Sequence, residues 1–133
     1  MSFAALNHVA VTVSDIGVSG PWYRALIGFD PVLDEHTDAG FRHLVWALDG
    51  GTLFGIHQHD QAIEPGEFTE FRAGLDHVGG FGCASRSELE SWASRLDGLG
   101  IAHGGVVDAH YGSGLSFRDP PDGIALEFFA PPE

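Results

Sequence analysis

The stretch Leu6-Asn7-His8-Val9 recurs in the second half of the chain as Leu75-Asp76-His77-Val78. Each copy is followed, at nearly the same spacing, by an apolar run that ends in a potential ligand: the first run ends in His57 and the second in Glu127. Two blocks of similar length, each with a candidate ligand near its first strand and another near its last, indicate a duplicated module. The duplication predicts one metal site built from four side chains, which are His8, His57, His77 and Glu127.

The composition predicts a soluble globular protein with one domain over residues 1–133, divided by the repeat into modules at about 1–62 and 72–133. An apolar share of 44% is enough to form a core. No apolar run is long enough to cross a bilayer, and the first residues lack the pattern of a signal peptide. The single cysteine, Cys83, excludes an internal disulfide and fits a reducing compartment, so we expect a cytoplasmic protein.

The charge balance restricts the partners. The chain has 19 acidic side chains against 6 basic ones, all arginine, for a formal net charge of −13. A surface of this sign repels phosphate backbones and anionic lipids, so we expect no nucleic acid and no membrane partner. An anionic small molecule would need a local cation, and Arg42 and Arg118 are favoured because both fall in predicted strands.

The first module begins with a strand. Large residues alternate with small or polar ones across 8–13, which places His8 on the face opposite the valines. Ser19 with Pro21 two residues later predicts a helix start, and Gly28 predicts its end. Three more strands are expected at 29–34, 41–48 and 52–58, the last two joined by a turn at Asp49-Gly50-Gly51.

The second module repeats the order. A strand over 75–83 is expected to carry His77, Gly79, Phe81 and Cys83 on one face. A capping box of Ser87 and Glu90 predicts the start of a helix that ends near Gly98. Further strands are expected at 102–108, 114–118 and 124–130.

Each module therefore has the order β-α-β-β-β. We expect an α+β fold in which two such modules form a curved, incompletely closed mixed β-sheet barrel with the helices outside. In the last strand, the alternation places Glu127 on a face between apolar neighbours. A carboxylate there needs a partner, and a cation would supply one.

The repeated opening and the ending Asp119-Pro120-Pro121-Asp122-Gly123-Ile124-Ala125-Leu126-Glu127 resemble the vicinal oxygen chelate superfamily. This superfamily includes glyoxalase I, extradiol dioxygenases, fosfomycin resistance proteins and bleomycin resistance proteins, and the resemblance covers the whole chain. It implies a divalent metal at the ends of the first and fourth strands of both modules. Those positions match His8, His57, His77 and Glu127. The resemblance also implies a homodimer and a small-molecule substrate chelated through adjacent oxygens.

Three imidazoles and one carboxylate suit Fe, Ni, Zn, Co or Mn, any of which would act as a Lewis acid on a substrate oxygen. The implied activity is that of a glyoxalase-type lyase or isomerase, or of a ring-cleaving dioxygenase. The candidate catalytic residues are Glu127, His57 and His110. His110 lies in a Gly-rich stretch and is suited to moving protons near neutral pH.

Several alternatives stay open at this point. His59 shares a face with His57 and is a rival fourth ligand. His8 and His77 are alternatively hydrogen-bonded structural histidines. The site can be formed by one chain or by two. The protein can also be a binding protein of the bleomycin resistance kind, which sequesters a drug or metabolite without catalysis.

Overall fold

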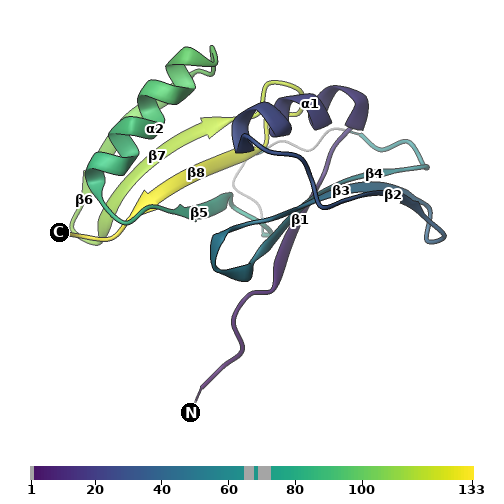
Figure 1. Cartoon of the computed structure of the whole chain (residues 1–133), viewed down its shortest axis with the longest axis horizontal. Coiled ribbons are helices and arrows are strands. Elements are labelled where there is room, and N and C mark those ends of the chain that lie inside the picture. Colours follow the sequence, from purple (N-terminus) through teal and green to yellow (C-terminus); the bar gives the residue numbers. More distant parts are fainter. Residues whose placement is uncertain (1, 65–67, 69–72) are drawn as a thin grey trace. The chain divides into compact units, whose positions relative to one another are not determined.

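The chain forms two compact units, Met1–Pro65 and Gly66–Glu133, in a computed structural model that describes residues 2–64, 68 and 73–133 (Figure 1). Each unit has the order β-α-β-β-β and contains one four-stranded mixed sheet and one helix. The strand orders are β1-β4-β3-β2 and β5-β8-β7-β6, and neither sheet is closed. The predicted α+β class with two βαβββ modules is therefore confirmed.

The first unit consists of β1 (His8–Thr12), α1 (Ile16–Ile27), β2 (Leu33–Thr37), β3 (Phe41–Ala47), a 3₁₀ turn η1 (Asp49–Gly51) and β4 (Leu53–His59). The second consists of β5 (Val78–Gly82), α2 (Arg86–Gly98), β6 (His103–Ala109), β7 (Gly112–Arg118) and β8 (Ala125–Ala130). In each unit the first and last strands pair in parallel, and the other neighbours pair antiparallel. Neither helix in the described part of the chain is long and apolar enough to span a membrane.

Each sheet packs one face against its own helix. In the first unit, Trp46 and Ile56 are fully buried, as is Tyr23 of α1. In the second unit, Leu115 and Leu126 are buried with Leu89 and Leu96 of α2. Burying each such side chain stabilises the fold by roughly 1.5–3 kcal/mol. Because side chains alternate along a strand, the opposite face of each sheet is left to the polar residues, His8 among them, as expected.

The start of α1 differs from the prediction. Asp15, not Ser19, caps the helix: its carboxylate accepts a hydrogen bond from the Gly17 amide at 2.9 Å. Ser19 lies inside the helix and is fully buried. Pro21 also lies inside the helix and not in its first turn. Gly28 ends the helix in the left-handed conformation, as predicted.

The strand expected at 29–34 lies instead at Leu33–Thr37. Its sequence, LDEHT, has no apolar alternation, because β2 is an edge strand with mostly exposed side chains. It is held to β3 partly by polar pairs across the strands, such as Asp34 with Arg42 and Glu35 with His43. A search for apolar periodicity therefore misses its true position.

The capping box of α2 lies two residues before the predicted one. The Ser85 hydroxyl accepts from the Glu88 amide at 3.3 Å, and the Glu88 carboxylate accepts from the Ala84 amide at 2.5 Å. The spacing Ser-x-x-Glu occurs twice in this stretch, at 85–88 and at 87–90. The structure uses the first copy, so the helix begins two residues earlier than predicted.

The strand β5 is shorter than predicted and contains a bulge. Val78 pairs with Leu126 and Phe81 with Phe128, so one extra residue lies between the two pairs. Gly80 takes a positive φ of 86° there. The bulge reverses the alternation: Phe81 contacts the buried Phe128 ring, and Cys83 is buried. The prediction that Phe81 and Cys83 share the face of His77 is therefore wrong.

The capping assignment predicts the effect of two serine substitutions. Ser85→Ala should lower the free energy of unfolding by about 1 kcal/mol, because it removes the acceptor for an amide at the helix start. Ser87→Ala is the comparison: its exposed hydroxyl lies 3.0 Å from that of Ser85 and accepts from no helix amide among the described residues, so the change should be less than about 0.5 kcal/mol. Urea unfolding of both variants measures the difference, and a larger loss in Ser87→Ala would contradict the assignment.

Candidate functional site

His77 directly precedes β5, and its ring is held by the residue before it. The Asp76 carboxylate lies 2.7 Å from Nδ1 of His77. Because an ionised carboxylate only accepts hydrogen bonds, Nδ1 carries the proton and donates. In this tautomer Nε2 is the nitrogen that carries the lone pair. A carboxylate behind the imidazole is the support typical of a metal-binding histidine.

The first unit repeats this arrangement at His8. Asn7 Oδ1 lies 2.8 Å from Nδ1 of His8, so the amide oxygen takes the place of the Asp76 carboxylate. In both units the residue before the histidine contacts Nδ1, so Nε2 is the ring nitrogen left for another partner. The repeated Asn/Asp-His pair thus has the same local geometry twice.

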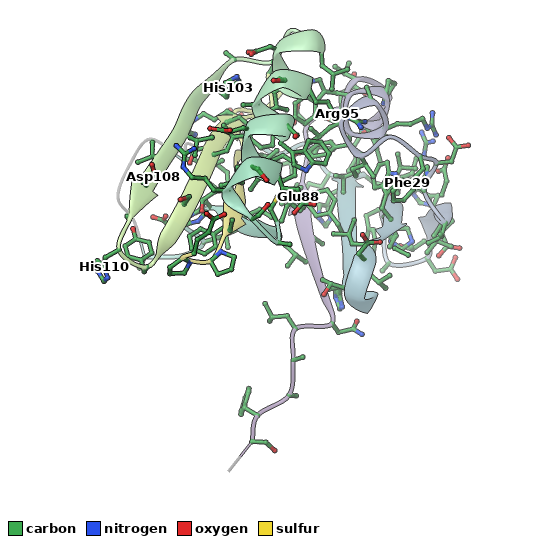
Figure 2. The ribbon with its side chains drawn as sticks, turned by 60° about the vertical axis from the view of Figure 1, so that its left-hand side comes forward. Phe29, Glu88, Arg95, His103, Asp108 and His110 are labelled. Carbon is green, nitrogen blue, oxygen red and sulfur yellow. The ribbon has the colours of Figure 1, made fainter. Side chains whose placement is uncertain are left out.

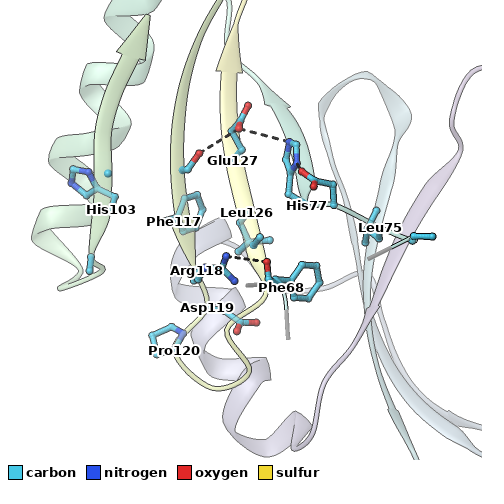
Figure 3. Close-up of a pocket in the computed structure, with 17 residues that line it drawn as sticks. Phe68, Leu75, His77, His103, Phe117, Arg118, Asp119, Pro120, Leu126 and Glu127 are labelled. Atoms are coloured by element: carbon cyan, nitrogen blue, oxygen red, sulfur yellow. Dashed lines mark hydrogen bonds and ion pairs between the residues drawn. The ribbon is translucent and has the colours of Figure 1, made fainter. Parts of the chain in front are cut away.

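Glu127 lies beside His77 on the open face of the second sheet. Its Oε2 is 3.7 Å from Nε2 of His77 and accepts a hydrogen bond of 3.3 Å from the Ser116 hydroxyl (Figure 3). The side chain is 22% exposed. On this face of β8 Glu127 lies between Ala125 and Phe129, and its carboxylate contacts an imidazole and a hydroxyl. An imidazole nitrogen and a carboxylate oxygen are thereby brought together.

Two glycines make room for this pair. A Cβ at Gly79 would lie 2.4 Å from Nε2 of His77, and a Cβ at Gly114 would lie 3.3 Å from Oε1 of Glu127. The first distance is impossible without movement of the ring. Glycine, which has no side chain, therefore occupies both positions next to the His77 imidazole and the Glu127 carboxylate.

The pair lies in a cleft of the second unit with a volume of about 1080 Å³ (Figure 3). This is the upper end of the range of small-molecule sites. The wall is formed by the segment before β5 and by strands β6, β7 and β8 with the turn that follows β7. Its side chains include Phe68, His103, Phe117, Arg118, Asp119 and Pro120.

Strand register shows that Glu127 and His57 are not equivalent. His8 pairs with Leu53, and the pairing of Val78 with Leu126 places Ala125 beside His77. Glu127 lies two residues beyond Ala125, so the matching position in the first unit is two residues beyond Leu53, at Gly55.

The antiparallel pairs agree with this assignment. Glu127 pairs with Ser116, and Gly55 pairs with Val45 at the same place in the first sheet. The amide that follows β1 donates to His57 O, and the amide that follows β5 donates to Phe129 O, both at 2.8 Å. His57 thus corresponds to Phe129. The equal spacing in the sequence that paired His57 with Glu127 was misleading.

His57 lies on the same face as His8 but four pairs further along the strands, since Thr12 pairs with His57. Its ring stacks on Phe41 at 4.4 Å between centroids and meets the His43 ring edge-on at 5.4 Å. Burial lowers the pKa of the His57 imidazole below its usual value, and the surrounding imidazoles, foremost His43, lower it further. His57 is therefore neutral at pH 7 and able to accept a proton.

His43 is a neighbour that the sequence reasoning missed. It pairs directly with His57 across β3 and β4, and its Nε2 lies 3.1 Å from Glu35 Oε1. The side chain of His43 is 15% exposed. The turn Asp49-Gly50-Gly51 could have revealed this neighbour, because the turn sets the hairpin register that places His43 opposite His57.

The remaining candidates lie apart from these groups. His59 faces the same side as His57, with 6.3 Å between ring centroids, but it is exposed. His110 is exposed at the tip of the β6–β7 hairpin, at the opposite end of β6 from His103 (Figure 2). Its ring meets Tyr111, which stacks on Phe129. The hairpin tip is three strand pairs or more from Glu127.

Within the described residues, no group of three or more His, Cys, Asp or Glu side chains is arranged as a complete set of metal ligands. The donor chemistry of the separate groups nevertheless fits a divalent transition metal. Two imidazoles present Nε2 with Nδ1 held from behind, and one carboxylate lies beside a ring where glycines leave space.

A profile described as the Glyoxalase/Bleomycin resistance protein/Dioxygenase superfamily matches residues 5–128. Among solved structures, a glyoxylase/bleomycin resistance protein/dioxygenase domain from Frankia sp. EAN1pec is 29% identical, with a TM-score of 0.82 over 98% of this chain and 100% of that chain. No curated protein matches the chain by sequence.

Two further solved structures share the fold at lower identity. A mutant of the fosfomycin resistance protein FosX from Listeria monocytogenes, complexed with Mn(II) and 1S,2S-dihydroxypropylphosphonic acid, is 15% identical. Its TM-score is 0.68, over 98% of this chain and 95% of that chain. Lactoylglutathione lyase from Agrobacterium tumefaciens is 17% identical, with a TM-score of 0.66 over 98% and 96%.

The lowered pKa of His57 predicts how stability depends on pH. In the metal-free protein, the His57 ring protons should titrate with a midpoint below 6.5 in an NMR pH series. As the pH falls through 6.5, the unfolded chain takes up this proton first, so His57 makes the fold less stable on the acid side. His57→Gln identifies the resonance and should reduce that acid loss. A midpoint at or above 6.5 would contradict the assignment.

Proposed function

Because the chain belongs to the glyoxalase/bleomycin resistance protein/dioxygenase superfamily, we propose that it is a metal-dependent enzyme acting on a small organic substrate through two adjacent oxygens. The observation that carries the proposal is the arrangement of Asp76, His77 and Glu127 in the cleft of the second unit. FosX, a protein of the same fold, is seen with Mn(II) and a compound that carries two hydroxyl groups.

The proposed ligands are His8, His77 and Glu127. A divalent Fe, Ni, Zn, Co or Mn ion would supply Lewis acidity toward the substrate oxygens. Gly55 occupies the position that corresponds to Glu127, so no fourth side chain comes from there. Three protein ligands leave coordination positions open for substrate, which is typical of catalytic sites.

His57 is proposed as the proton-transferring group and not as the fourth ligand. It lies four strand pairs from the register position of His8, and its lowered pKa keeps the ring neutral. A neutral imidazole accepts a proton from a substrate carbon or hydroxyl. His110 is the other candidate catalytic residue from the sequence. We propose that it reaches a bound substrate only when the β6–β7 hairpin moves.

A ring-cleaving dioxygenase is the second candidate activity, and Gly55 favours it. Two histidines and one carboxylate with open positions form the set that non-haem iron oxygenases use. Oxygen uptake by the Fe(II)-loaded protein with catechol separates the two candidates. Uptake that depends on both iron and catechol supports the dioxygenase, and its absence supports lyase or isomerase chemistry.

The remaining parts of the proposal follow from the family. We propose that the partner is a small molecule, that the protein acts as a homodimer, and that it works in the cytoplasm. Sedimentation of the metal-loaded protein tests the dimer directly.

Metal analysis tests the central claim. Protein purified without a metal-affinity tag should bind one of the five ions, and Glu127→Gln should weaken that binding by more than about 100-fold, since even the loss of an outer partner costs about 10- to 100-fold. Glu90→Gln, which changes a carboxylate paired with Arg86 on α2, is the matched control. If the wild type binds none of these ions, the protein is a non-catalytic binding protein instead.

A second prediction concerns the glycine beside His77. Gly79→Ala should reduce metal affinity by about tenfold or more, because the new methyl group would displace the imidazole ring. Gly98→Ala is the control, since a Cβ there meets nothing within 4 Å. Calorimetric titration with Zn²⁺ measures both. Equal affinity in the two variants would argue against His77 as a ligand.

A further inference from the structure

Arg118 lies on the same face of the second sheet as Glu127. It is the last residue of β7 and pairs with Ala125, two residues along the strands from the pair of Ser116 and Glu127. Side chains two residues apart point to the same side, roughly 7 Å from one another along the strand. Arg118 therefore lines the same cleft as the His77–Glu127 pair (Figure 3).

Among the residues that the structure describes, no carboxylate forms an ion pair with Arg118. Its two hydrogen bonds go to backbone carbonyls, Gly123 O at 2.8 Å and Phe68 O at 3.4 Å. These occupy two of the five N–H groups of the guanidinium. In the described part of the chain, other arginines differ in this respect: Arg24, Arg42 and Arg86 each form an ion pair with an aspartate.

The carboxylates of the cleft wall already have partners. Asp76 accepts from His77, and Glu127 accepts from Ser116. Asp119 is fully buried and accepts from the amides of residues 122 and 124 at 3.0 Å each. The cleft therefore combines engaged carboxylates with one guanidinium that has N–H groups to donate. The chain has a net charge of −13 and only six arginines, so a guanidinium in the cleft wall is a distinctive property of this cleft.

We infer that the substrate carries a carboxylate that binds Arg118, in addition to the adjacent oxygens that bind at the His77–Glu127 end of the cleft. This inference rests on the proposed function, since it names the substrate class of the same site. A carboxylate matches the fork of a guanidinium, and a charge-assisted bond of this kind is about twice as strong as a neutral one. Arg118 is thus a specificity-determining residue.

Two probes that differ only in the carboxylate test the inference. Catechol offers adjacent oxygens, and 3,4-dihydroxybenzoate adds a carboxylate at the far side of the ring. Calorimetry on the Zn²⁺-loaded protein should show that 3,4-dihydroxybenzoate binds about tenfold or more tightly than catechol. Arg118→Gln should abolish this preference, so that the two probes bind the variant with nearly equal affinity.

Arg42→Gln is the matched control, because it removes the same charge from a strand arginine that is held by Asp34 at 3.1 Å. It should keep the full preference for the carboxylate. Arg118 also bonds to the turn at Gly123, so thermal unfolding of each variant is measured first. If Arg118→Gln does not fold, Arg118→Lys should still reduce the preference, because an ammonium group cannot form two parallel bonds to a carboxylate.

A third probe separates this inference from the metal site. If Zn²⁺ is not retained and catechol does not bind, the proposed function fails, and benzoate is titrated into the metal-free protein by NMR. Amide shifts at Ser116 and Gly123 in the wild type and Arg42→Gln, absent in Arg118→Gln, support the anion site alone. Equal binding of the two dihydroxy probes to the wild type, an undiminished preference in Arg118→Gln, or benzoate shifts that persist in it would overturn the inference.

Discussion

The parallel pairing of the first and last strands in each unit is the constraint on which the candidate site depends. Val78 pairs with Leu126, and both side chains are buried. The residues on either side of that pair, His77 and Glu127, then point to the opposite face of the sheet. A shift of one residue in this register would exchange the faces, so packing of the core against the helix also fixes the positions of the polar groups.

Much of the fold could be predicted because it follows periodic signals. The duplication, the α+β order and most strands rest on alternation and on turn residues, and the hairpin at Asp49-Gly50-Gly51 was found where expected. The edge strand β2 was misplaced because its side chains are polar on both faces. The cap of α2 was misplaced because two overlapping copies of the same motif compete, and only packing decides between them.

The site was predicted in part, because the two modules differ in length between their corresponding positions. His77 and Glu127 are 50 residues apart, whereas His8 and Gly55 are 47 residues apart, and the bulge of β5 supplies one of the three extra residues. Counting along the sequence therefore aligned Glu127 with His57, whereas strand register aligns it with Gly55. The neighbourhood of His43 and His57 needed the register of β3 and β4, which residue types alone do not give. His77 with Glu127 could be foreseen, since both lie next to the same parallel pair.

The strand β2 has a consequence for the behaviour of the protein at high concentration. As an outer strand it presents unpaired backbone groups, to which a strand of another molecule could add. Its sequence places Asp34, Glu35 and His36 in a row along that border. Adding a flat strand there would bring charged side chains of both molecules together without water. The polar residues that gave β2 no apolar alternation thus also protect the sheet from edge-to-edge aggregation.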